Sequence, residues 1–158
     1  MKYVDYALLS LWGMLLPQAA FADNEALRLS AADRSYVSVP CFQTPAEMTV
    51  EAWLKTAQGG TGTIVAWKDA GADGESSMFR VQNGRLQYGE WYTGSWSEIN
   101  SAQTVNNDLW CHVAIVRKGH EAKLYINGVL SATASMNASA SCTTDDLKIG
   151  ALGTTWSV

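Results

Sequence analysis

The sequence lacks several features that mark common functional classes. Basic residues are in the minority, with 11 lysines and arginines against 15 aspartates and glutamates and a net charge of −4. Nucleic acids and anionic membranes are bound through basic patches, so neither is expected as a partner. After the first 22 residues, no window of ten or more residues has the apolar stripe and caps of a helix. Internal repeats, linkers and low-complexity blocks are also missing.

Catalytic motifs are missing as well. There is no Gly-x-Ser-x-Gly nucleophile elbow, and the two histidines fall in a strand-like segment (His112) and a turn-like segment (His120). Glycoside hydrolysis needs two carboxyl groups about 5–9.5 Å apart. Glu51 stands alone in its strand, and the adjacent Asp145 and Asp146 point to opposite faces. Zinc-ligand spacing is absent too. The sequence therefore predicts a protein that is not an enzyme.

The first 22 residues have the pattern of a secretory signal peptide. Lys2 gives a positive start, residues 6–16 are uncharged and apolar, and Ala20–Ala22 fits the small-x-small cleavage pattern. The apolar run is too short to span a bilayer comfortably. Asp5 is unusual in such a leader. We therefore predict a signal peptide at 1–22, a domain at 23–158 and no membrane span, with the protein secreted, periplasmic or at the cell surface.

The remaining chain is a series of short β-strands with turn signals between them. In the segment 109–133, Val113 and Ile115 alternate with residues of the opposite face, and Asn127-Gly128 suits a type I′ turn. Asn83-Gly84 is a second hairpin signal of the same type. The expected strands are residues 26–29, 36–39, 48–55, 63–67, 78–81, 85–88, 99–105, 112–116, 124–126, 129–133 and 147–150. Such spacing predicts an all-β sandwich.

Four segments, taken in order, resemble the laminin-G-like, concanavalin A-like lectin-glucanase domains, a family that includes the pentraxins. They are ALRLSAADRSYVSVP at 26–40, MTVEAWLKT at 48–56, the whole of 109–133, and LKIG at 147–150. The resemblance implies a two-sheet antiparallel jelly-roll sandwich and a non-catalytic extracellular recognition module. It also implies a last strand beside residues 48–55, for which this sequence has no counterpart. We therefore expect a C-terminally truncated fragment with further domains of the same polypeptide, or a partner that supplies the strand.

Aromatic residues gather between positions 88 and 96. Tyr88, Glu90, Trp91, Tyr92 and Trp96 fall within nine residues, and Glu98 and Asn100 lie nearby. Flat aromatic faces stack on sugar rings, and carboxylates accept hydrogen bonds from hydroxyl groups. Because these residues surround Gly94, we expect a loop that binds carbohydrate through all five. The alternative is that the tryptophans pack on a sheet edge in an adhesion or structural module, whose partner is an extracellular protein.

Calcium is the one candidate cofactor. Asp69 and Asp73 lie in an acidic, glycine-rich loop, where the resemblance to pentraxins implies part of a calcium site. Calcium binds six to eight oxygens. The other ligand positions implied by the resemblance follow LKIG, and here they read Ala151-Leu152-Gly153, without a side-chain oxygen. A solvated acidic loop is the alternative interpretation of Asp69 and Asp73.

Three cysteines follow the predicted leader: Cys41, Cys111 and Cys142. An oxidising compartment permits one disulfide, and three pairings are possible. Cys41 ends a strand and Cys142 precedes one, so the two would be neighbours if those strands run antiparallel. We favour this pairing, with Cys111 left as a thiol buried beside Trp110.

Overall fold

The computed structural model describes residues 4–7, 26–30, 32–40, 45, 47–68, 76–92, 94–136 and 146–151. Within these ranges the chain forms strands and no helix. The strands are β1 (Val4–Ala7), β2 (Leu27–Leu29), β3 (Val37–Val39), β4 (Glu47–Thr56), β5 (Thr61–Lys68), β6 (Ser76–Gln82), β7 (Arg85–Tyr92), β8 (Ser95–Thr104), β9 (Cys111–Lys118), β10 (Glu121–Ile126), β11 (Val129–Ser135) and β12 (Leu147–Ile149).

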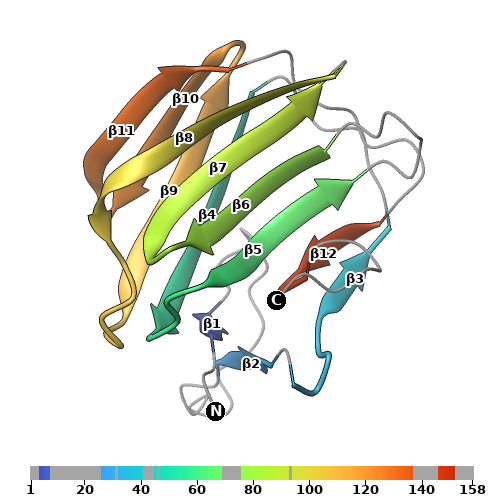
Figure 1. Cartoon of the computed structure of the whole chain (residues 1–158), viewed down its shortest axis with the longest axis vertical. Coiled ribbons are helices and arrows are strands. Elements are labelled where there is room, and N and C mark those ends of the chain that lie inside the picture. The colour runs from blue at the N-terminus through green and yellow to red at the C-terminus, as the bar shows by residue number, and fades with distance from the viewer. Residues whose placement is uncertain are drawn as a thin grey trace, which may run out of the picture.

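The strands form two layers that face each other (Figure 1). Sheet A has six strands in the order β11-β10-β9-β4-β1-β2, and sheet B has six in the order β3-β12-β5-β6-β7-β8. Neighbouring strands run antiparallel in both sheets. The prediction of an all-β, two-sheet antiparallel sandwich is confirmed, and residues 111–135 form the expected three-stranded meander.

Two Asn-Gly turns set the register of their hairpins. Asn83 and Gly84 have φ of 51° and 76°, and Asn127 and Gly128 have φ of 51° and 77°. Positive φ at both central residues is the geometry of a type I′ turn, whose twist matches that of the flanking strands. The turns close the β6–β7 and β10–β11 hairpins as the sequence predicts.

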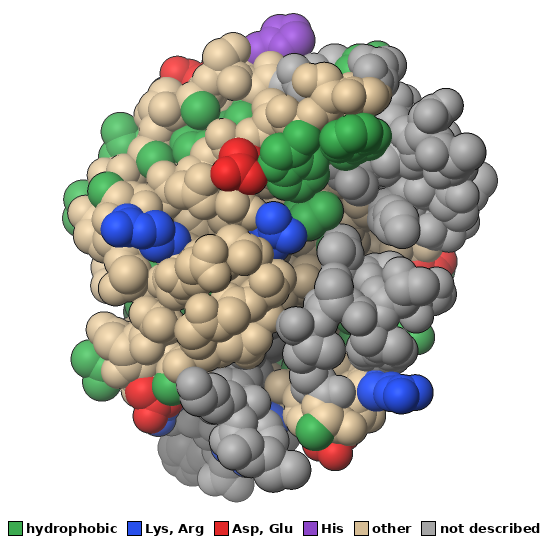
Figure 2. Space-filling view, in the orientation of Figure 1, with side chains coloured by type: hydrophobic (Ala, Val, Ile, Leu, Met, Phe, Trp, Pro, Cys, Tyr) green, Lys and Arg blue, Asp and Glu red, His purple; other side chains and the backbone are tan. Residues whose placement is uncertain are grey.

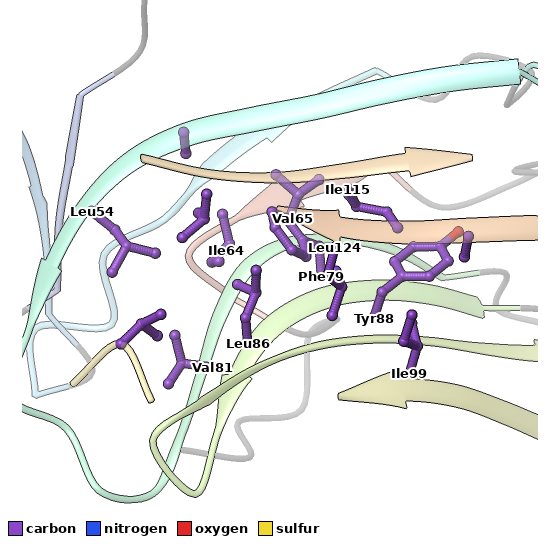
Figure 3. Close-up of a cluster of buried hydrophobic side chains, with 14 of the residues drawn as sticks. Leu54, Ile64, Val65, Phe79, Val81, Leu86, Tyr88, Ile99, Ile115 and Leu124 are labelled. Atoms are coloured by element: carbon purple, nitrogen blue, oxygen red, sulfur yellow. The ribbon is translucent and has the colours of Figure 1, made fainter. Parts of the chain in front are cut away.

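The core lies between the sheets, where alternate residues of each strand point inward. In β9, Val113 and Ile115 are fully buried, and in β4 the same is true of Leu54. Sheet B contributes Phe79 from β6 and Tyr88 from β7, and Figure 3 shows them among the same buried side chains. Each such side chain contributes roughly 1.5–3 kcal/mol through burial. The period of two in the sequence therefore fixes which face of each strand becomes core.

One charged pair joins the sheets through this core. Arg117 of β9 donates from Nε to Glu90 Oε1 at 2.9 Å and from Nη2 to Glu90 Oε2 at 2.8 Å, and both side chains are fully buried. The hydroxyl of Tyr88 donates to Glu90 Oε1 at 2.6 Å. A buried carboxylate requires such partners because it has lost its hydration. Glu90 is therefore part of the interior.

The predicted loop around Gly94 is wrong. β7 continues to Tyr92 and β8 begins at Ser95, so the tryptophans at 91 and 96 lie on paired strands. The reversal is short because Gly94 has φ of 79°, which glycine adopts without steric penalty. β8 begins four residues before the predicted strand 99–105, because Ser95 to Glu98 has no clear alternation of apolar and polar residues.

Residues 4–7 occupy a position that the sequence analysis left open. They form β1, which pairs with β4 on one side and β2 on the other. This is the place beside residues 48–55 where the family resemblance implies a final strand. The proposed cleavage region near Ala22 lies outside the described residues, so the signal peptide stays a prediction.

Candidate functional site

The tryptophans at 91 and 96 stand opposite each other across β7 and β8. Neighbouring residues in a strand point to opposite faces. Trp91 therefore projects from the outer face of sheet B, because the adjacent Glu90 points into the core. Trp91 is 36% exposed, and Trp96 is half-buried. Figure 2 shows hydrophobic side chains gathered with an acidic and a basic side chain over the outer face of sheet B.

The Trp96 ring lies over the backbone of Gly89. A Cβ atom at position 89 would come within 2.2 Å of Trp96 Cζ2, which is much less than a van der Waals contact. The guanidinium carbon of Arg80 lies 5.8 Å from the Trp96 ring centroid, within the range of a cation–π interaction. The absence of a side chain at Gly89 thus lets the indole pack closely against β7, and Arg80 of β6 contacts the ring.

A chain of polar side chains crosses three strands beside this ring. Arg80 Nε donates to Gln87 Oε1 at 2.6 Å, and Gln87 Nε2 donates to Asn100 Oδ1 at 2.8 Å. Asn100 Nδ2 donates to Glu98 Oε1 at 3.1 Å, and Trp96 Nε1 donates to Glu98 Oε2 at 2.7 Å. Each group fixes the orientation of the next one, so the site is pre-organised.

Glu98 and Arg80, the two charged side chains of this hydrogen-bonded row, both stay ionised near neutral pH. Hydrogen bonds from Trp96 and Asn100 hold the pKa of Glu98 below its usual value, and the charge of Arg80 acts in the same direction. Partial burial lowers the pKa of Arg80, and the Glu98 carboxylate opposes that shift. An arginine remains protonated in either case. The outer face therefore offers a fixed anion and a fixed cation beside an indole ring.

Three of the five predicted ligand-binding residues, Tyr88, Glu90 and Tyr92, are not on this face. Tyr88 and Glu90 are fully buried, and they point into the core with their hydroxyl and carboxylate bonded to each other. The sequence grouped them with the tryptophans because they are close in the chain, whereas a strand sends alternate residues to opposite sides. Tyr92 is half-buried at the end of β7, opposite Ser95, on the side of the strand to which Glu90 points.

The predicted metal ligands and disulfide lie outside the described residues. Asp69 and Asp73 cannot be placed, and the described part of the chain has no cluster of three or more histidine, cysteine, aspartate or glutamate side chains suited to a metal ion. Ala151, at one of the other implied calcium positions, is buried and has no side-chain oxygen. Calcium therefore stays a prediction.

The two strands that flank the predicted disulfide are paired with each other. Cys41 and Cys142 are not described, but β3, which ends just before Cys41, pairs antiparallel with β12, which begins after Cys142. The condition on which that pairing depends is thus met, and the disulfide itself stays a prediction. Cys111 is a buried free thiol whose pKa is raised by burial.

The two histidines occupy separate surroundings. His112 Nε2 lies 3.4 Å from Glu51 Oε2, and its ring is 5.5 Å from that of Trp53, on the outer face of sheet A. His120 is exposed, with Nδ1 3.0 Å from the carbonyl oxygen of Met136. A histidine that activates a side-chain nucleophile lies within hydrogen-bond reach of it. The contacts seen here are with a carboxylate, a ring and a backbone oxygen.

Three residues of the site were not predicted from the sequence: Arg80, Gln87 and Gly89. A usable signal was present, because the Asn83-Gly84 turn places position 80 opposite 87 and position 78 opposite 89. Extending that register by one strand would have placed Asn100 beside Gln87. What the sequence could not indicate was the direction in which the Trp96 ring lies.

The two antiparallel six-stranded sheets define an all-β, two-sheet sandwich. The family described as the concanavalin A-like lectin/glucanases superfamily matches residues 31–157, and the chain belongs to this superfamily. This confirms the resemblance on which the sequence analysis relied. A search of curated proteins found no significant match.

Solved structures share the fold at low identity. Domains LG4-5 of the mouse laminin alpha1 chain match with a TM-score of 0.61 and 15% identity, over 78% of this chain and 33% of that chain. The LG1-3 region of the laminin alpha2 chain gives 0.61 and 17%, over 78% and 25%. The Ruminococcus gnavus IT-sialidase CBM40, bound to alpha2,3 sialyllactose, gives 0.58 and 17%, over 68% and 64%. This chain thus spans a third or less of the laminin structures.

Among the described residues, no helix is long and apolar enough to cross a membrane.

Proposed function

We propose that this domain is a non-catalytic carbohydrate-binding module that holds its ligand on the outer face of sheet B. We name this surface the outer-face patch, and it consists of Trp91, Trp96, Glu98, Asn100 and Arg80. The observation that carries the proposal is the Trp96 indole, which packs on Gly89 and is held by Glu98 and Arg80. A pre-oriented aromatic ring bordered by fixed polar groups is the usual design of a sugar subsite.

The patch supplies the two kinds of contact that a sugar needs. The exposed Trp91 offers apolar area for the C–H face of a pyranose ring. The exposed Glu98 and Asn100 side chains offer oxygens that accept from hydroxyl groups, and Arg80 offers N–H donors. These side chains are already hydrogen-bonded to one another before a ligand arrives. Little side-chain entropy is therefore lost on binding. We expect a surface site with modest affinity for each sugar unit.

The positions of the carboxylates favour binding over hydrolysis. Glycosidases need two carboxyl groups on either side of one scissile bond. Glu98 lies on the outer face of sheet B, opposite Gly89, while Glu90 on the neighbouring strand points into the core and is held by Arg117. No substrate on the outer face can contact both carboxyl groups. Among the described residues of β7 and β8, Glu98 is thus the only carboxylate available to a ligand.

The comparisons support this class of function at the level of the fold. One similar structure is a carbohydrate-binding module in complex with a sialylated sugar, and others are laminin domains. A shared fold does not fix the ligand. The choice of a glycan over a protein partner therefore depends on the outer-face patch itself.

The test is a glycan array probed with the wild-type chain and matched tryptophan variants. Trp91→Ala should lower the retention of any bound glycan by about tenfold or more, as expected when one stacking contact is lost. Glu98→Gln should weaken binding as well. Trp53→Ala is the control, because Trp53 is a similarly exposed tryptophan on sheet A. Equal glycan retention by the wild type and Trp91→Ala would falsify the proposal.

A protein-interaction module is the second candidate function, and a different surface favours it. Leu109, Trp110, Val129 and Leu130 are large hydrophobic residues that are 45–66% exposed. They lie at one end of sheet A, because β9 follows Trp110 directly and Asn127 donates to the carbonyl oxygen of His112. Exposed apolar surface of this kind marks protein contacts. On an array of extracellular proteins, Val129→Ser should lower binding and Trp91→Ala should not.

Export from the cytoplasm is part of the same proposal. Glycans and matrix proteins are extracellular ligands, and residues 1–22 have the leader pattern described above. Cell fractionation followed by N-terminal sequencing of the exported chain tests this. We expect a first residue near Asp23, and full retention in the cytoplasm would contradict it.

A further inference from the structure

The hydrogen bonds of the outer-face patch all run in one direction. Arg80 Nε donates to Gln87 Oε1, and Gln87 Nε2 donates to Asn100 Oδ1. Asn100 Nδ2 then donates to Glu98, which also accepts from Trp96 Nε1. A guanidinium can only donate and an ionised carboxylate can only accept. The row therefore has a donor end at Arg80 and an acceptor end at Glu98, and the amide between them cannot exchange these roles.

The two ends lie on either side of β7 and contact the same indole. Arg80 is on β6, opposite Gln87, and Glu98 is on β8, opposite Gly89. Neighbouring strands are about 4.8 Å apart, so the backbones of β6 and β8 are roughly 10 Å apart. The guanidinium carbon of Arg80 lies 5.8 Å from the Trp96 ring centroid, and Glu98 Oε2 lies 2.7 Å from Trp96 Nε1. A sugar beside this indole is therefore within reach of both a donor and an acceptor.

The charges of these two ends oppose each other. Hydrogen bonds from Trp96 and Asn100 hold the pKa of Glu98 below its usual value, so the carboxylate is ionised. Arg80 is protonated at any physiological pH. Each of the two charges favours the ionised form of the other. The patch therefore presents one anion and one cation to a ligand, and Figure 2 shows an acidic and a basic side chain beside hydrophobic ones on this face.

The neighbouring charged side chains are too remote to change this balance. Glu90 points into the core, where an arginine binds it. Arg85 is four residues from Gly89 along β7, roughly 13 Å away, and donates to backbone carbonyl oxygens of β8. Lys148 of β12 is three strands from β7, about 14 Å away, and its Nζ is 3.6 Å from Asp146 Oδ2. Physiological salt screens exposed charges over about 8 Å.

We propose that the outer-face patch selects neutral glycans over anionic ones, and that Glu98 is the residue that sets this preference. The inference rests on the proposed glycan binding and names the class of glycan. An anionic sugar group is attracted by Arg80 and repelled by Glu98, so it loses hydration without a net electrostatic gain. A hydroxyl group can both donate and accept, so the hydroxyls of a neutral sugar match both ends of the row.

The test uses the full chain and pairs of glycans that differ by one anionic group. Each pair consists of a neutral oligosaccharide and its monosulfated form, printed on the same array. The wild type should retain the neutral member about two- to fivefold more strongly, which is the effect of one exposed charge contact. Isothermal titration with the best-retained pair then gives the ratio of the two dissociation constants.

Two variants of the patch should move this ratio in opposite directions. Glu98→Gln keeps an oxygen that accepts from Trp96 but removes the anion, so Arg80 is left to attract the sulfate. Binding of the sulfated member should rise about two- to fivefold, and this gain should disappear in about 1 M salt, where screening acts over about 3 Å. Arg80→Gln leaves Glu98 unopposed and should widen the preference for the neutral member. Glu47→Gln is the control, because it removes an exposed glutamate from sheet A and should leave the ratio unchanged.

The possible failures are distinguishable. Equal retention of both members by the wild type, or a preference for the sulfated member, overturns the charge selection while glycan binding itself stands. The same ratio in the wild type and in Glu98→Gln overturns the role of Glu98. Retention of no glycan by the wild type overturns the proposed function and this inference together.

Discussion

Arg117 and Glu90 form a bidentate ion pair that ties sheet A to sheet B inside the core, with N–O distances of 2.9 and 2.8 Å. The pair is fully buried, so each charge depends on the other and on its hydrogen bonds for compensation of its lost hydration. Tyr88 donates a further hydrogen bond to the same carboxylate. This triad holds the strand whose outer side carries Trp91, so the stability of the core and the geometry of the outer-face patch are linked through β7.

Removing one partner of the ion pair should destabilise the protein strongly. Glu90→Ala leaves a buried guanidinium without its carboxylate, and we expect a loss of about 3–5 kcal/mol in the free energy of unfolding. The double variant Glu90→Leu with Arg117→Met should lose much less, because no charge is left in the core. Urea denaturation followed by tryptophan fluorescence measures both. A Glu90→Ala chain as stable as the wild type would show that the pair is open to water.

Tyr88 should make the protein sensitive to alkali. Burial raises its pKa above the ordinary value of 10.0, and the neighbouring Glu90 carboxylate acts in the same direction. In the unfolded chain the phenol ionises near its ordinary pKa, while in the folded chain it stays protonated. Stability from this group is therefore complete below about pH 10 and declines above it, by up to about 1.4 kcal/mol per pH unit.

The measurement is urea denaturation at several pH values between neutral and strongly alkaline. Tyr88→Phe removes the phenol and keeps the ring, so its stability should decline less steeply above the ordinary tyrosine pKa than that of the wild type. The difference between the two slopes of unfolding free energy against pH gives the contribution of Tyr88 apart from that of the other tyrosines. Identical slopes would mean that Tyr88 ionises as readily in the folded chain as in the unfolded chain.

Gly89→Ala should displace the Trp96 ring. The new methyl group would meet the ring at 2.2 Å, and the indole must move because the three nearest atoms all belong to it. We expect a changed near-ultraviolet circular dichroism signal and loss of glycan retention, with a smaller effect on unfolding than that of Glu90→Ala. Gly59→Ala is the matched control, since a Cβ atom there meets nothing within 4 Å. Unaltered spectra for Gly89→Ala would contradict the stacked position of Trp96.

Cys111 should be unreactive until the chain unfolds. Its side chain is buried, and burial raises the pKa of the thiol above its ordinary value of 9.0. Because the thiolate is the reactive form, alkylation by N-ethylmaleimide near neutral pH should be slower by about tenfold or more than in urea. Mass spectrometry of the alkylated chain also shows whether Cys41 and Cys142 are protected as a disulfide. Rapid alkylation of Cys111 without denaturant would contradict its burial.

Much of the fold could be predicted because it is encoded locally. Asparagine and glycine at 83–84 and 127–128 readily adopt the positive φ of the turns. The alternation of apolar and polar residues in β4 and β9 indicates which face is buried. These signals need no knowledge of distant residues. The family motifs added the order in which the strands are joined into two sheets.

The site was predicted only in part, because it depends on contacts between residues on different strands. Closeness in the chain placed Tyr88 and Glu90 with Trp91, yet the pleat of β7 divides them between core and surface. Cross-strand register brings Arg80 into the outer-face patch and places Gly89 beneath the Trp96 ring.

The sequence by itself therefore determined most of the strands, the two Asn-Gly turns and the family, since each depends on residues that are neighbours in the chain. Only the tertiary structure decided which aromatic residues face solvent, that Glu90 is the partner of Arg117, and that residues 4–7 lie beside β4. Those relations join strands that are far apart in sequence, and they are set by side-chain packing and charge compensation between the sheets.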